Sequence, residues 1–443
     1  MQSTPARPEI RSPAPRSTTP ARVFVPLPAR LVSLDAYRGF VMLAMISGGL
    51  GLHGIAHEML KNQPDHPLWP TIGFHTEHVL WEGCAFWDLI QPSFMFMVGV
   101  AMAFSNAKRR SQGQSYAGLF GHALLRAALL ILLGVFLRSN SQLGKDNAHT
   151  NFTFVDVVSQ IGLGYVFLFL VWGQSFATQL VVALAILISY WCFFFFHPIP
   201  PDGLVIPHQP AGYVVLEGIR APWNIHLNSA AGFDQWFLNL FPPQNYTHNP
   251  GGYQTLNFIP ALATMIFGLM AGEWLRRDYS LQRRCLGLLL AGGLGIGLGY
   301  LLHITGACPV IKKIWTPSWA IYSAGWASVL LGTFFFLFDV INLKPLAWPL
   351  TVVGRNSLAI YVLHSLLAGW LVLTIATHFG APFFRWIAPV FQEPIRTQWM
   401  EQPPANVFHL FGDYQPLAQS LVVVFVLWGV AMWMDRRKLY LKI

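Results

Sequence analysis

The sequence predicts an all-α integral membrane protein, a bundle of about ten transmembrane helices. Two observations carry this prediction. Hydrophobic residues make up 54% of the 443-residue chain and charged residues only 11%, whereas a soluble domain has roughly 25% charged residues. Apolar stretches long enough to cross a hydrocarbon core of about 30 Å also recur along nearly the whole chain.

The predicted spans follow one another along the chain and are interrupted by one long loop. We place them at about 33–52, 85–105, 118–137, 155–172, 179–196, 256–275, 285–303, 317–337, 347–376 and 415–434. The ninth is long enough to tilt, bend or contain a break. The long loop, at about 197–255, is rich in Pro, aromatic and amide residues, which favours an ordered cap over a flexible linker.

Basic residues concentrate on alternate connections between the spans. Examples are Lys108-Arg109-Arg110, Arg276-Arg277 and Arg436-Arg437-Lys438. Because Lys and Arg are retained on the cytoplasmic side, both termini are predicted to be cytoplasmic. The net charge of +9 then reflects topology and contact with anionic lipid, and it is no argument for nucleic-acid binding. Residues 1–30 are rich in Pro, Arg, Ser and Thr, which predicts a disordered cytoplasmic tail.

Polar residues in or beside the spans fall into two layers. Near the cytoplasmic ends lie Asp35, Arg38, Arg126, Arg355 and Asn356, and near the outer ends lie His78, Asp88, Asp156, Gln160, His303, Lys312 and Lys313. Charged residues within spans usually face a bundle interior or cavity, so the layers predict a polar path through the bundle. Structural roles compete with this interpretation: Asp35 and Arg38 can pair on one helix face, and Asp156 can cap a helix.

Histidines are frequent in the first outer loop, which contains His53, His57, His75 and His78 together with Glu58 and Glu77. Imidazoles and carboxylates can bind zinc. However, the HExxH order is absent and a loop of this kind does not fix ligand geometry. We therefore expect no metal site, and a hydrated loop or an acid–base histidine is the favoured interpretation.

Several short motifs match those of a known family. They are Ser33–Gly39, Trp81-x-Gly83, Asp88-Leu-Ile-x-Pro92 through Gly99, Ser159–Gly162, Pro260–Gly272, Lys312–Ser318 and Gly354–Leu363. These motifs occur in the same order as in the family and extend over about residues 31–376. Through them the sequence resembles the heparan-α-glucosaminide N-acetyltransferase family of multi-span acyltransferases, which includes many bacterial members.

The resemblance implies acetyl transfer across a membrane. Acetyl-CoA would be the acyl donor, supplied from the cytoplasm, and an amino sugar or other glycan on the outer side would accept the acetyl group. The active-site histidine of the family precedes the Trp-x-Gly motif by three residues and corresponds to His78, and the family's Asp in the second span corresponds to Asp88. The resemblance further implies a transmembrane acyltransferase domain at 31–443 in the inner (plasma) membrane of a bacterium.

The chain departs from the family pattern at three places. The loop before His78 is longer and carries additional histidines, so His75 is a rival for the catalytic position. Glu82 stands where a neutral residue such as Asn is expected. Asn257 and Phe258 replace the small hydroxyl residues that usually precede Pro260. These departures concern the acceptor side of the site more than the fold.

The two layers then acquire chemical roles. Arg38 and Arg355, with Asn356, are predicted to bind the CoA phosphates, because a guanidinium forms paired charge-assisted hydrogen bonds to phosphate. His78 would act either as general base or as acetyl carrier, with Asp88 setting its tautomer. The candidates for oxyanion or substrate contacts are Lys312, Lys313, Asn224 and Asn228.

Two other classes compete with an amino-sugar acetyltransferase. One is a transporter or flippase for a sugar or lipid-linked solute, with Asp88, Asp156 and His78 as a proton relay. No internal duplication is visible, which counts against it. The other is an O-acyltransferase of an exported glycan.

The expected partners of the protein are membrane lipid and a small-molecule or glycan acceptor. A homodimer is compatible with the sequence, and no nucleic acid is expected.

Overall fold

The computed structural model describes residues 31–198 and 206–441, so the tail predicted at 1–30 lies outside the described residues. The described ranges are helical and contain no β-strand. The helices are α1 Val32–Ser47, α2 Leu52–Asn62, α3 Trp69–His75, α4 Ile90–Ser111, α5 Tyr116–Asn140, α6 Val157–Val171, α7 Phe176–Phe195, α8 Ser229–Phe237, α9 Phe258–Leu275, α10 Leu281–Ile304, α11 Pro317–Phe335, α12 Lys344–Gly354, α13 Ser357–His378, α14 Ala381–Ile387, α15 Ile395–Glu401 and α16 Gln415–Arg436.

The predicted membrane spans are confirmed as helices. Nine helical segments of the described ranges are long and apolar enough to cross a membrane. The remaining predicted span, the fourth, at 155–172, corresponds to α6, which is apolar but has only 15 residues. The chain is therefore a helical integral membrane protein with multiple spans.

The long ninth span contains the break that its length allowed. α12 ends at Gly354 and α13 begins at Ser357, so Arg355 and Asn356 lie at the junction. Gly39 of α1 touches the backbone of Leu350, and Gly354 touches the backbone of Asp35. Because neither glycine has a side chain, α1 and α12 approach closely enough to hold the junction against α1.

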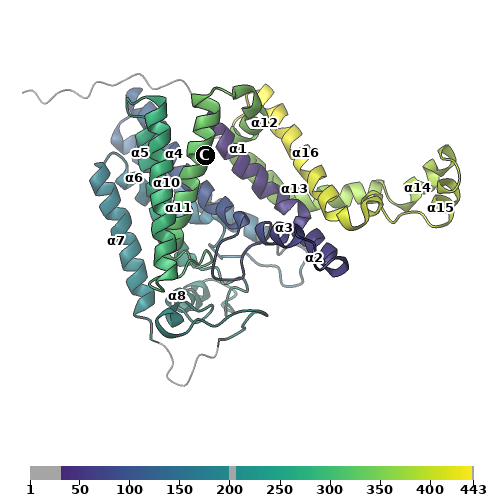
Figure 1. Ribbon diagram of the computed structural model, residues 1–443, viewed down its shortest axis with the longest axis horizontal. Coiled ribbons are helices and arrows are strands. Elements are labelled where there is room, and N and C mark those ends of the chain that lie inside the picture. Colours follow the sequence, from purple (N-terminus) through teal and green to yellow (C-terminus); the bar gives the residue numbers. More distant parts are fainter. Residues whose placement is uncertain (1–30, 199–205, 442–443) are drawn as a thin grey trace, which may run out of the picture.

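The first span ends in a sharp turn. Gly48, Gly49 and Gly51 have φ angles of 52°, 68° and 66°, a left-handed conformation that glycine adopts without steric penalty. The turn separates α1 from α2, which lies beyond the lower end of α1 in Figure 1. It thereby directs the first loop, with its histidines, across the end of the bundle.

The two ends of the bundle differ chemically, and we call them the basic end and the cap end. The basic end is where α1 and α13 begin and α4 and α16 end; Arg355 there pairs with Asp435 of α16 at 2.9 Å. The cap end is the opposite end, covered by the segment 206–254 with α8, at the bottom of Figure 1. The predicted loop at about 197–255 is thus ordered into a cap where the structure describes it.

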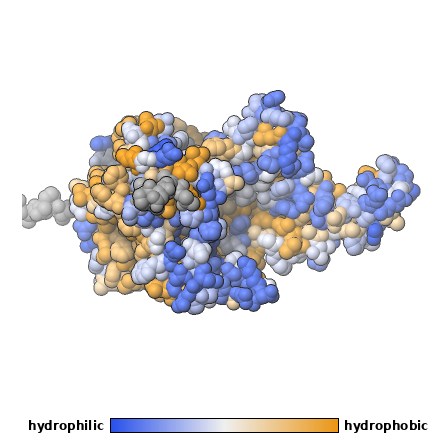
Figure 2. Space-filling model, turned by 90° about the horizontal axis from the view of Figure 1, so that it is seen from below, coloured by the Kyte–Doolittle hydropathy of each residue, from blue (hydrophilic) through white to orange (hydrophobic). Residues whose placement is uncertain are grey.

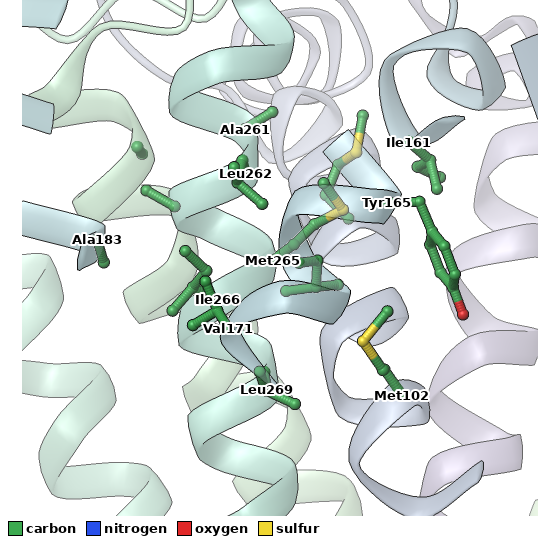
Figure 3. Close-up of a cluster of buried hydrophobic side chains, with 14 of the residues drawn as sticks. Met102, Ile161, Tyr165, Val171, Ala183, Ala261, Leu262, Met265, Ile266 and Leu269 are labelled. Carbon is green, nitrogen blue, oxygen red and sulfur yellow. The ribbon is translucent and has the colours of Figure 1, made fainter. Parts of the chain in front are cut away.

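The centre of the bundle is formed by α4, α6 and α9. Met102, Tyr165, Met265 and Leu269 are among its buried side chains, and Figure 3 shows them meeting between the helices. Gly99 of α4 and Gly268 of α9 each touch the backbone of the other helix. Small residues at such crossings are the usual basis of tight helix packing in membranes.

The outer surface fits a lipid environment on the bundle and water beyond it. Exposed apolar side chains cover the outward faces of α5, α7 and α10, including Leu132, Ile188 and Leu294. Seen from below in Figure 2, apolar residues dominate the bundle, whereas the end of the arm that carries α14 and α15 is largely hydrophilic.

Candidate active site

A buried carboxylate lies where the chain enters α4. Asp88 is the third residue of the 3₁₀ turn Phe86–Leu89 that precedes α4. Its Oδ2 accepts hydrogen bonds from the backbone N–H of Ala85 at 3.0 Å and of Val79 at 3.3 Å. An anion at a helix N-terminus is further stabilised by the helix dipole. The local fold therefore supports a charged Asp88 although the side chain is only 1% exposed.

The other oxygen of Asp88 joins it to a histidine and a lysine. Asp88 Oδ1 lies 2.8 Å from His78 Nδ1 and 3.3 Å from Lys312 Nζ. Lys312 Nζ also lies 3.0 Å from His78 Nδ1. Lys312 is as deeply buried as Asp88, with 3% of its side chain exposed, whereas 43% of the His78 side chain is exposed. One group of this cluster is thus exposed to solvent, and two are enclosed.

The contacts define how His78 is used. In the tautomer that carries its proton on Nδ1, His78 donates to Asp88 Oδ1, and Lys312 Nζ donates to the same oxygen. Nε2 then carries the free lone pair of the imidazole. Asp88 Oδ1 therefore orients the imidazole through Nδ1.

Lys312 reaches this cluster because two loops pair with each other. Gly83 N–H donates to Val310 O at 2.9 Å, and Glu82 forms a β-bridge with Ile311. Lys313, the next residue, donates from Nζ to Leu80 O at 2.8 Å. The pairing aligns the Trp81-x-Gly83 motif with the segment before α11 and so fixes the distance between Lys312 and His78.

Burial sets the charge state of the two lysines. Desolvation lowers the pKa of Lys312 to about 8, although Asp88 acts in the opposite direction. Burial also lowers the pKa of Lys313, again opposed by Asp88. Lys312 is therefore largely charged at neutral pH and loses its proton only a little above it. Burial raises the pKa of the neighbouring Cys84 thiol to about 12, which excludes a thiolate nucleophile there.

Glu82, the unexpected acid in the Trp-x-Gly motif, has structural partners. Its Oε1 accepts a hydrogen bond from Arg220 Nη1 at 2.8 Å and lies 3.5 Å from His303 Nδ1. Arg220 belongs to the cap and His303 to the end of α10. Glu82 therefore ties the loop that carries His78 to the cap and to α10.

The remaining histidines of the first loop are separate from the cluster. His75 Nδ1 accepts from Phe86 N–H at 3.3 Å, His53 lies 3.0 Å from Glu77, and His57 lies 3.8 Å from Glu58. Across the described part of the chain, three or more His, Cys, Asp or Glu side chains nowhere form a group able to hold a metal ion. Between His75 and His78, only His78 contacts Asp88 in the described structure.

Asn224 and Asn228 lie inside the cap rather than beside His78. The Asn224 amide accepts from Tyr213 O–H at 2.8 Å and from Leu216 N–H at 2.9 Å, and it donates to two backbone carbonyls. Asn228 caps α8, accepting from Ala231 N–H at 3.0 Å. Both side chains are buried and are used by the cap's own backbone.

A cavity of about 840 Å³ opens at the basic end. Its cationic lining residues are Arg38, Lys108, Arg109, Arg126 and Arg355, and its single acidic one is Asp35. The lining then follows α4 inward from Lys108 to Phe94, a distance of about 21 Å at 1.5 Å per residue. Phe94 in turn lies less than two helical turns from Asp88. The lining is therefore mostly charged at the basic end and mostly apolar along α4, with Arg126 of α5 as a cation farther in, and it extends along α4 in the direction of Asp88.

All three residues that were predicted to bind the CoA phosphates form polar contacts within the protein. Arg355 Nη1 donates to both carboxylate oxygens of Asp435, at 2.9 and 3.0 Å. Arg38 lies 3.7 Å from Asp35. Asn356 accepts from Leu441 N–H at 3.4 Å and is not among the residues that line the cavity. Sequence reasoning attributed Lys108 and Arg109 to topology alone, and their place in the cavity wall became visible only with the fold.

A smaller pocket of about 260 Å³ is lined by residues of α4, α5, α6 and α13 together with Asn249 and Tyr253. Gln91, Arg138, Asp156, Tyr253 and Tyr361 are among its lining residues. Gln91 lies one turn along α4 from the wall of the large cavity, and Tyr361 lies one turn along α13 from it. Asp156 also caps α6 through Ser159 N–H at 2.9 Å, as the capping interpretation predicted. The polar path through the bundle that the ionisable layers predicted stays a prediction.

Comparison with known proteins gives a distant relationship. No family model matches the chain. The chain is 23% identical over 384 residues to the heparan-alpha-glucosaminide N-acetyltransferase of Homo sapiens, a match that covers 76% of this chain and 53% of the relative. The protein of the same name from Mus musculus is 23% identical over 382 residues, covering 77% and 54%. The chain spans about half the length of these curated relatives.

Proposed function

We propose that the chain is a membrane acetyltransferase that takes acetyl groups from acetyl-CoA at the basic end and transfers them to an amino sugar or other glycan at the cap end. The observation that carries this proposal is the alignment of two features. A cation-lined cavity of about 840 Å³ runs along α4, and the exposed imidazole of His78 lies beyond its inner end. The distant relationship to enzymes named N-acetyltransferases supports the same chemistry.

The shape of the cavity suits the donor. CoA has phosphates at its nucleotide end and a thin, mostly neutral arm that ends in the thioester. The cations at the mouth would bind the phosphates, and the apolar stretch along α4 would hold the arm. The acceptor would enter from the smaller pocket at the cap end. In this proposal the basic end faces the cytoplasm of a bacterial inner membrane.

In the proposed reaction His78 Nε2 removes a proton from the acceptor amine while the nitrogen attacks the thioester carbonyl carbon. The CoA thiolate then leaves and receives the proton from His78. Asp88 holds the imidazole through Nδ1 and stabilises its charged form. The acetyl-carrier route uses the same Nε2 as nucleophile, with an acetylimidazole formed before the acceptor reacts.

The test is acetyl transfer by the purified full-length chain in proteoliposomes. Radiolabelled acetyl-CoA is supplied on one side and glucosamine, galactosamine or glucose on the other. We expect label on the two amino sugars and little on glucose. Label on glucose as well would identify an O-acyltransferase. Movement of unlabelled sugar without any acetylation would identify a transporter and overturn the proposal.

Removing Lys108 and Arg109 together is expected to weaken acetyl-CoA binding about tenfold to a hundredfold, because each can form a charge-assisted bond to phosphate. Isothermal titration at two salt concentrations measures this loss, which should shrink at high salt. Arg110→Ala is the matched control, since Arg110 adjoins both residues but does not line the cavity. Arg355→Ala should weaken binding less, because Asp435 already engages its guanidinium. Unchanged affinity in the double variant would remove the cavity mouth from the donor site.

A further inference from the structure

A second cavity, of about 340 Å³, lies on the lipid-facing side of the bundle. Its walls come from α4, α7, α9, α10 and α11, and they are formed by aromatic, aliphatic and small side chains that include Phe96, Phe267, Trp274, Gly287, Ala291 and Gly295. From Gly287 to Gly295 it follows α10 for about 12 Å. A groove of this shape and polarity matches a hydrocarbon chain.

An arginine cluster adjoins the groove at the basic end. Arg276, Arg277, Arg283 and Arg284 surround the turn between α9 and α10. Trp274, which lines the groove, donates from Nε1 to Arg284 O at 3.1 Å. Arg277 lies over the Trp274 ring, with its guanidinium carbon 5.8 Å from the centroid. The apolar groove and the arginine cluster are thus continuous through Trp274.

Two features of the arginine cluster indicate an anionic ligand. The Nε atoms of Arg276 and Arg284 are buried without a hydrogen-bond partner in the described structure. Arg283 and Arg284 also occupy the first turn of α10, where the helix dipole disfavours cations. The nearby acids are Glu273, which accepts from Gln179 at 3.1 Å, and Asp278, so four arginines face two carboxylates.

We propose that this site binds one anionic glycerophospholipid, with its phosphate on the arginine cluster and one acyl chain in the groove. The combination selects the ligand: a free phosphate leaves the groove unfilled, and a neutral lipid leaves the cations uncompensated. Arginine binds phosphate through paired hydrogen bonds, and each cation near a membrane surface adds attraction to acidic lipid. The site is separate from the large cavity and does not depend on the proposed acetyl transfer.

Native mass spectrometry of the full-length protein tests this, with dioleoyl phosphatidylglycerol, dioleoyl phosphatidylcholine and inorganic phosphate as the three probes. Wild-type protein should retain one phosphatidylglycerol more tightly than phosphatidylcholine. Arg276→Gln/Arg284→Gln should weaken phosphatidylglycerol retention about thirtyfold and abolish the preference. Ala291→Phe, which narrows the groove, should weaken retention of both lipids. Arg436→Gln/Arg437→Gln at the end of α16 is the matched control and should behave as wild type.

Three results would overturn the proposal. The first is equal retention of the two lipids by wild-type protein. The second is an unchanged preference for phosphatidylglycerol in the Arg276/Arg284 variant. The third is displacement of bound phosphatidylglycerol by inorganic phosphate at matched concentration, which would assign the cluster to a free anion. Ala291→Phe keeps all four arginines, so the groove is tested even if the double arginine variant folds poorly.

Discussion

Replacing His78 with alanine is expected to lower the rate of acetyl transfer by roughly 10²–10⁴-fold, the usual contribution of a positioned general base. His78 is the one group of the cluster with substantial exposure, and its Nε2 is left free by the contact of Nδ1 with Asp88. Binding of acetyl-CoA should be nearly unchanged, because the phosphate-binding cations lie at the other end of the cavity. Turnover of radiolabelled acetyl-CoA and titration of the donor measure the two effects separately.

His75→Ala is the matched control for this prediction. His75 is three residues away and only accepts a hydrogen bond from Phe86 N–H at 3.3 Å, so its loss should leave most activity. Near-normal turnover in His78→Ala together with loss in His75→Ala would transfer the catalytic role to His75. Incubation with labelled acetyl-CoA without acceptor separates the two routes: label retained on wild-type protein and absent from His78→Ala identifies an acetyl carrier, and no retained label identifies a general base.

The membrane spans could be predicted because the hydrophobic pattern alone determines them. The length of the ninth span allowed a tilt, a bend or a break, and the sequence neither chooses the break nor places it at Arg355 and Asn356. The turn after α1 was missed: the prediction extended the first span to residue 52, whereas α1 ends at Ser47. A run of glycines that remains apolar does not interrupt a hydropathy signal, yet it allows the left-handed turn.

The candidate site could be predicted only in part. His78 and Asp88 are ten residues apart, and their motif suggested that they act together; the structure brings them to 2.8 Å. Lys312 was a candidate for the oxyanion, but its contacts are with Asp88 and His78, 224 and 234 residues away in sequence. Only the pairing of two loops brings it there. The use of the Asn224 amide could not be predicted from the sequence either. The amide is of the type that binds sugars, but backbone groups of the cap form hydrogen bonds with it.

The departure at Glu82 becomes understandable once the loops are in place. An acid at this position has two cationic or titratable neighbours, Arg220 and His303, which come from the cap and from α10. Its loss would loosen the loop that carries His78 without removing any group of the catalytic cluster. The acid that looked out of place in the motif therefore serves the position of the site rather than its chemistry.

Asp88→Ala is expected to destabilise the protein by about 3–5 kcal/mol, because it leaves Lys312 as a buried charge without its partner. Asp88 and Lys312 are 1% and 3% exposed, so solvent offers little compensation. Thermal unfolding in detergent measures the loss. Asp88→Ala/Lys312→Met should recover most of the stability, because neither charge then remains buried, while acetyl transfer stays low because His78 loses the contact at Nδ1. A double variant as unstable as Asp88→Ala would show that the pair is not coupled.

The same pair predicts how this loss depends on pH. The pKa of Lys312 in the folded wild type is about 8, below the usual value for lysine because of burial. Removing Asp88 takes away the interaction that raises this pKa, so the folded variant accepts the proton only at lower pH. As pH falls toward about 8, both forms lose stability because the unfolded chain binds a proton at Lys312 that the folded chain does not. Below about pH 8 this loss stops in the wild type, whose folded form is now protonated, and continues in the variant, so the gap in unfolding free energy widens as pH falls. Above about pH 8 Lys312 is neutral in both folded forms, and the gap should be constant. A gap that is the same at pH 6.5 and pH 9 would contradict a charged Lys312 held by Asp88.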